Sequence, residues 1–83
     1  MVSPELAEVV RRGQQLYAER LRPVLEPGQD GRFIAIEPDS GDYFLGDTAL
    51  EAIKALRRTY PDQLACLLRV GYPAVAEIGF GSR

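Results

Sequence analysis

Four acidic residues lie close together in the middle of the chain and are the first candidates for chemistry: Glu37, Asp39, Asp42 and Asp47. Carboxylate oxygens are the ligands that calcium and magnesium ions prefer. The spacing lacks the alternating ligands and the distal glutamate of an EF-hand loop. Turns also collect aspartate for backbone reasons alone. We therefore favour a structural turn over a metal site and predict no metal or other cofactor.

The triplet Asp39-Ser40-Gly41 has the residue types of the aspartic protease motif, in which two carboxylates share a proton across a dimer. That motif follows an apolar strand and continues with a small residue. Here the triplet follows Pro38 and continues with Asp42, inside what reads as a hairpin turn. This context does not provide the geometry for a shared proton, so we predict no protease activity.

The chain contains no histidine and a single cysteine, Cys66. Catalysis by Ser-His-Asp or Cys-His groups and the usual zinc sites are therefore excluded. Cys66 lies in an apolar run, which is typical of a small buried hydrophobic residue. We predict no catalytic residues and a protein that is not an enzyme.

Binding to nucleic acid would need a clustered basic surface. The net charge is −2, although four arginines do lie on the first predicted helix: Arg11, Arg12, Arg20 and Arg22. Because glutamates are interleaved with them, we favour a solvated helix face. A nucleic-acid-binding regulator that uses this helix is kept as the alternative function. A small-ligand or divalent-metal binding domain that uses the acidic turn is the second alternative.

The first predicted helix spans residues 4–22, with Ser3 as its N-cap and Pro4 at its first position. Its apolar face has members at steps of three and four residues: Leu6, Val10, Gly13, Tyr17, Leu21 and Val24. Gly13 within this face either allows a close approach of another backbone or is a weak point. Pro23 predicts a stop or kink near Arg22.

The segment after this helix predicts a β-hairpin followed by a second helix. Residues 32–37 form a strand that is apolar on both faces, which indicates a central strand covered on both sides. A turn over residues 38–41 leads to an antiparallel strand over 42–45. Thr48 and Glu51 fit a capping box at the start of the second helix, which ends before Pro61.

Two further strands are predicted, over residues 64–70 and 74–78, with a loose end at 79–83. The order is therefore α-β-β-α-β-β, an α+β domain with a mostly antiparallel sheet and helices packed on one face. The third strand is expected beside the first and antiparallel to it. One domain over 1–83 follows, with helix 4–22, a ββαβ core over 32–70, and a short strand and loose C-terminus over 74–83.

Three motifs carry a resemblance to a known group of proteins: Gly31-Arg32-Phe33-Ile34-Ala35-Ile36, then Gly46-Asp47-Thr48-Ala49-Leu50-Glu51-Ala52, then Tyr60-Pro61. The chain resembles the DUF5678-like group of small prokaryotic proteins of unknown function over about half of its length. The resemblance implies a small ββαβ-type module. It implies no catalytic or ligand-binding residue.

These observations predict a small non-enzymatic protein-interaction or regulatory module, for example the antitoxin-like subunit of a two-protein system. The expected partner is a second copy in a homodimer or a separate protein, with the first helix packing on its own sheet, on another chain, or on both. We favour a protein partner over nucleic acid, which stays with the alternative function, and we expect no binding to a membrane and a cytoplasmic location. The candidate interaction surface has six members: Leu6, Val10, Gly13, Tyr17, Tyr43 and Tyr72.

Overall fold

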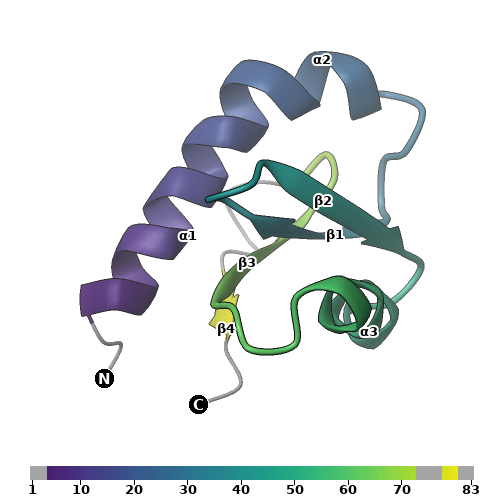
Figure 1. The fold of residues 1–83 in the computed structure, drawn as a ribbon. Helices are drawn as coiled ribbons and strands as arrows, with labels where there is room; N and C mark the ends of the chain where they lie inside the picture. Colours follow the sequence, from purple (N-terminus) through teal and green to yellow (C-terminus); the bar gives the residue numbers. More distant parts are fainter. Residues whose placement is uncertain (1–3, 73–77, 81–83) are drawn as a thin grey trace.

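A computed structural model describes residues 4–72 and 78–80 as a four-stranded sheet with helices on both faces (Figure 1). The N-terminal helix has three consecutive segments: α1 (Pro4–Leu16), η1 (Tyr17–Leu21) and α2 (Arg22–Leu25). The remaining elements follow in the order β1 (Phe33–Glu37), β2 (Asp42–Gly46), α3 (Ala49–Thr59), β3 (Ala65–Arg69) and β4 (Ile78–Phe80).

The strands are arranged in the order β2-β1-β3-β4, and every neighbouring pair is antiparallel. β1 pairs with β2 from Phe33 opposite Gly46 to Glu37 opposite Asp42. On its other side, β1 pairs with β3. The predicted position of the third strand, beside the first and antiparallel to it, is confirmed.

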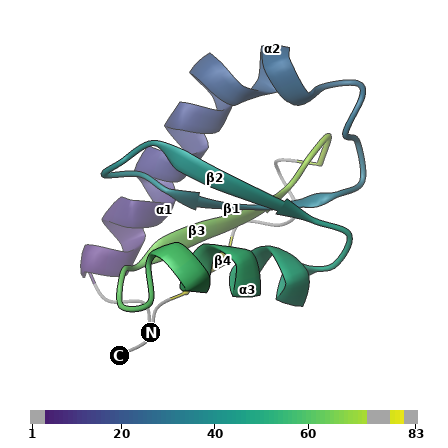
Figure 2. The same ribbon diagram turned by 45° about the vertical axis from the view of Figure 1, so that its right-hand side comes forward.

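The two helical layers cover opposite faces of the sheet (Figure 2). Ile34 and Ile36 pack in the core under α1, η1 and α2, whereas Ala35 packs in the core under α3. The α+β class is confirmed, but the prediction that the helices share one face is wrong. The physical reason is that successive side chains of a strand point to opposite faces of the sheet. The apolar residues of β1 therefore lie on both faces, and both faces must be covered.

The N-terminal helix continues past its predicted end. Pro23 has no N–H group and cannot make a regular helical hydrogen bond. The preceding turn, η1, widens to a π-helix, and the Arg22 N–H donates to the Tyr17 carbonyl. The helix then ends at Leu25, so of the predicted stop or kink near Arg22 the stop is wrong, and the structure has an irregular π-helical turn there instead. The observed order also differs from the predicted one, because the first helix is divided into three segments.

Helix α1 approaches β3 closely at Gly13. A Cβ atom added at Gly13 would lie 2.5 Å from the Cβ of Cys66 and 2.8 Å from its Sγ. Both residues are buried. Of the two interpretations kept open for Gly13, the close approach is therefore the correct one.

Tyr17 connects the N-terminal helix to the loop that follows β3. Its side chain is 1% exposed, and its hydroxyl donates a hydrogen bond to Glu26. The same hydroxyl accepts the Gly71 N–H at 3.2 Å, across 54 positions of sequence. The Arg22 guanidinium lies over the ring, 5.5 Å from its centre. Tyr17 thus ties the π-helical turn to the loop that follows β3.

The C-terminal part differs from its prediction. Most of the predicted strand 74–78 lies outside the described residues, and β4 covers Ile78–Phe80 instead. Gly79 and Phe80, which were expected to be loose, pair with Cys66 and Ala65 of β3. They form the outermost strand on the β3 side of the sheet.

Gly13→Ala should destabilise the protein by roughly 1–3 kcal/mol, the usual cost of overpacking a core. The new methyl group would overlap the Cβ of Cys66, which cannot move without its backbone. Gly28→Ala is the matched control, because its nearest atom would lie 4.0 Å away. Urea denaturation measures both variants. Equal stabilities for the two would contradict the close contact.

The stability of the protein should fall at alkaline pH, partly through Tyr17. Burial, followed by the hydrogen bond to Glu26, raises the pKa of the Tyr17 phenol. The folded state therefore keeps this proton after the unfolded chain begins to lose it, near pH 10. The resulting stabilisation is present below that pH and is lost as the pH rises towards the folded-state pKa.

Tyr17→Phe should flatten this alkaline decrease, because the group that titrates is absent. Denaturation curves of wild type and variant between neutral and alkaline pH provide the measurement. The variant should also be less stable at neutral pH, since the Glu26 carboxylate and the Gly71 N–H each lose their hydrogen bond with the Tyr17 hydroxyl. An alkaline decrease equal to that of wild type would rule out the role of Tyr17.

Candidate interaction surface

The four acidic residues near the hairpin do not converge on one site. Asp42 and Asp47 stand at opposite ends of β2, where Asp42 accepts a hydrogen bond from Tyr60 and Asp47 pairs with Arg32. Asp39 pairs with Arg12. Within residues 4–72 and 78–80, no group of three or more His, Cys, Asp or Glu side chains could hold a metal ion.

Glu37 organises the turn between β1 and β2. The residue is 2% exposed, and its carboxylate accepts the backbone N–H groups of Ser40 at 2.8 Å and Asp39 at 3.2 Å. The Gly41 N–H donates to the Glu37 carbonyl at 2.9 Å, and Gly41 has a φ of +82°. A buried carboxylate is tolerated because the turn supplies these donors. Glu37 therefore fixes the backbone that carries Asp39 and Ser40.

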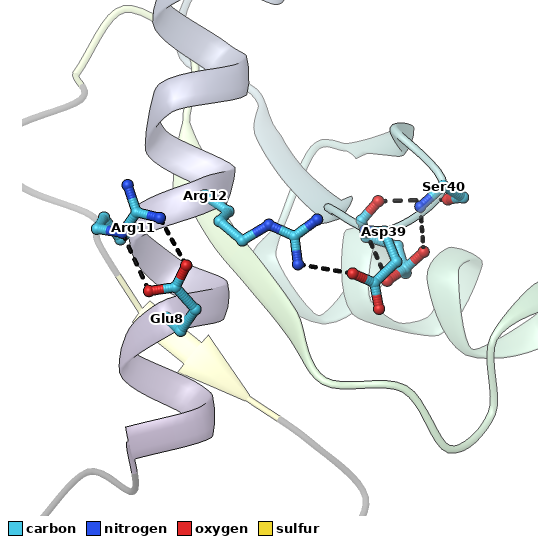
Figure 3. Close-up of polar contacts among 6 residues, drawn as sticks. Glu8, Arg11, Arg12, Asp39 and Ser40 are labelled. Carbon is cyan, nitrogen blue, oxygen red and sulfur yellow. Dashed lines mark hydrogen bonds and ion pairs between the residues drawn. The ribbon is translucent and has the colours of Figure 1, made fainter.

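An ion pair joins this turn to helix α1 (Figure 3). An Arg12 guanidinium nitrogen donates to the Asp39 carboxylate at 2.7 Å, and the two residues are 27 positions apart. Both side chains are partly exposed, at 41% and 68%. A pair in this setting contributes at most about 1 kcal/mol to stability. Its cost of opening is small, so a partner with suitable charges can replace it.

Two hollows flank the Arg12–Asp39 pair, and together they form what we call the helix–turn groove. The first has a volume of about 340 Å³ and lies between the turn 38–41 and a stretch of helix with these members: Arg12, Gln15, Leu16, Glu19 and Arg20. The second has a volume of about 280 Å³ and lies between Glu5, Glu8, Val9 and the loop 62–64.

The groove changes charge along its length. Around the second hollow, the carboxylates of Glu5, Glu8 and Asp62 outnumber the basic groups. The hydrogen bond from Arg11, followed by that guanidinium's charge, lowers the pKa of Glu8 and keeps it ionised. Around the first hollow, Arg20 adds a positive charge and Glu19 a negative one beyond the Arg12–Asp39 pair. The groove is thus acidic at one end and mixed in charge at the other.

Most of the arginines on the N-terminal helix are engaged within the fold. Arg11 pairs with Glu8, Arg12 with Asp39, and Arg22 with Glu26 at 3.5 Å. Arg20 is exposed. The arginines therefore do not form a continuous surface of uncompensated positive charge.

The six residues predicted as an interaction surface lie in different places. Gly13 and Tyr17 are buried against the sheet, and Val10 packs against the same core. A partner cannot reach Gly13 or Tyr17 in this fold. Leu6 is half-buried on α1. Tyr43, on β2, is 36% exposed, and Tyr72, after β3, is 48% exposed and lies beneath the Arg69 guanidinium.

No local sequence pattern indicates the Arg12–Asp39 pair, because its two residues lie on a helix and on a distant turn. The role of Glu37 could have been predicted from the sequence. A carboxylate directly before a Pro-Asp-Ser-Gly turn can accept the N–H groups of that turn.

Comparisons with known proteins add no family. No family model, no curated protein and no solved structure matches the chain. The resemblance to the DUF5678-like group stays a prediction. None of the helices in the described part of the chain is both long enough and apolar enough to span a membrane.

Glu37→Gln should lower the free energy of unfolding by about 1–3 kcal/mol. An amide provides one acceptor oxygen, so one N–H of the turn would face the new NH₂ group. Chemical denaturation measures the effect, with the exposed Glu19→Gln as control. A variant as stable as this control would show that the turn does not depend on the second oxygen.

Proposed function

We propose that the protein is a non-enzymatic protein-interaction module, and that a separate protein partner binds in the helix–turn groove. The small, antitoxin-like subunit of a two-protein system is the concrete form that we favour. The observation that carries the proposal is the change of charge along the groove, from the carboxylates near Glu5 and Glu8 to the exposed Arg20.

This charge pattern suits a protein segment with a basic end and an acidic end. Basic side chains of the partner would face Glu5, Glu8 and Asp62, while an acidic side chain would face Arg20. Complementary charges of this kind select the partner and orient it during encounter. The Arg12–Asp39 pair at the centre can exchange its partners at small cost.

A nucleic acid suits the same surface less well. Its phosphates would meet the carboxylates of Glu5, Glu8 and Asp62 beside any contact to Arg12. Each arginine released from an intramolecular ion pair would also leave an unpaired carboxylate. The partner experiment is therefore designed to distinguish a protein partner from the nucleic-acid alternative.

The test is capture of the partner by tagged protein after nuclease treatment. Wild type should retain a stoichiometric protein partner, whereas the double variant Arg12→Glu, Arg20→Glu should lose it, because both positive charges of the groove are reversed. The matched control is Lys54→Glu with Arg58→Glu. This variant makes the same change in net charge on exposed positions of α3, across the sheet from the groove.

Circular dichroism verifies that all three proteins are folded. Equal capture by wild type and the groove variant would place the partner elsewhere. Loss of capture in the α3 variant as well would show a non-specific charge effect. In a parallel capture without nuclease, recovery of nucleic acid in place of a protein partner would favour the alternative function.

A further inference from the structure

Strand β2 is an open edge of the sheet. It is the outermost strand in the order β2-β1-β3-β4, and no strand of the described residues pairs with its outer side. Open edges are commonly protected by proline, lysine or a bulge. β2 is short and begins with the charged Asp42, but it has no proline, lysine or bulge: its sequence is Asp-Tyr-Phe-Leu-Gly, and its five residues pair with β1 without interruption.

We propose that this edge pairs with β2 of a second copy of the chain, antiparallel and about a two-fold axis at Phe44. In this register, Phe44 lies opposite Phe44 of the second copy. Tyr43 then lies opposite Leu45 of the second copy, and this apolar pair occurs twice. Asp42 lies opposite Gly46 of the second copy, so the two Asp42 carboxylates are at opposite ends of the ladder.

The axis at Phe44 is preferred over its neighbours. Directly opposed residues of an antiparallel pair lie on the same face of the sheet, so an axis perpendicular to the sheet must pass through a residue position. An axis at Tyr43 would place Asp42 opposite Phe44. An axis at Leu45 would place Tyr43 opposite Asp47. Only the axis at Phe44 pairs all five residues of β2 and leaves apolar side chains opposite apolar ones.

The same axis joins the layers of the two copies. Tyr43 and Leu45 belong to the face covered by α1, because they lie opposite Ile36 and Ile34 of β1. Phe44 belongs to the face covered by α3. A perpendicular two-fold axis leaves α1 on the same side in both copies. The result is a continuous eight-stranded sheet between two helical layers, and the interface is isologous.

The predicted association is a monomer–dimer equilibrium. Stable dimers bury about 800 Å² on each partner, and one five-residue strand supplies only part of such an area. The core of each copy is covered without the partner, since both faces of β1 and β3 are packed under helices. The dimer should therefore form as concentration rises and dissociate on dilution.

Sedimentation velocity over micromolar to millimolar concentrations tests the proposal. Wild type should shift from monomer to dimer, and Tyr43→Glu should raise the dissociation constant about tenfold or more. The new carboxylate would lie diagonally across from its own counterpart and from Asp47 of the second copy. Tyr72→Glu is the matched control, because this tyrosine of similar exposure follows β3, two strands away from the edge.

Amide hydrogen exchange is the second measurement and does not depend on a variant. Outward N–H groups of β2 should gain protection in wild type as concentration rises. A monomer at every concentration, unchanged dimerisation of Tyr43→Glu, or loss of dimer in Tyr72→Glu would each overturn the proposal. The groove variant Arg12→Glu, Arg20→Glu should still dimerise, so failure of edge pairing and failure of partner binding are distinguishable.

Discussion

Burial of β1 on both faces is the constraint on which the rest of the structure depends. Ile34, Ala35 and Ile36 are fully buried, and Glu37 is 2% exposed. One helical layer can cover only one side of such a strand, so the chain needs a second layer on the other side. The N-terminal helix and α3 provide these layers, and the two flanking strands supply the backbone hydrogen bonds that a central strand requires.

The two layers reach the sheet by different means. Under α3, three fully buried alanines leave space for the helix to approach closely: Ala35, Ala52 and Ala65. Under α1, the strands carry large side chains such as Ile34 and Leu68, and the close approach is instead made by Gly13 against Cys66. A small domain has little core to spare, so each layer depends on such a contact for its packing density.

Local chemistry predicted much of this fold. The structure confirms the turn 38–41, the start of α3 and the pairing of β3 beside β1. At the start of α3, Thr48 accepts the Glu51 N–H at 3.1 Å, and Glu51 accepts the Asp47 N–H at 2.9 Å. The turn and the helix start each involve residues that are close in sequence. The position of β3 follows from the handedness of the helical crossover between β2 and β3. Long-range geometry determines which face of the sheet each helix covers. It also determines the contacts of Arg12 with Asp39 and of Tyr17 with Gly71. No local pattern encodes such contacts.

The same geometry limits where a partner can bind. Because the apolar face of the N-terminal helix from Val10 to Leu21 packs on its own sheet, the two binding surfaces that we propose are the groove and the β2 edge. These two surfaces meet at the turn that Glu37 holds: residues 38–41 line the groove, and Asp42 begins the edge strand. The donors that satisfy the buried carboxylate also make this turn rigid. A partner in the groove and a second copy at the edge would therefore both bind a preformed hairpin, with little ordering cost at either surface.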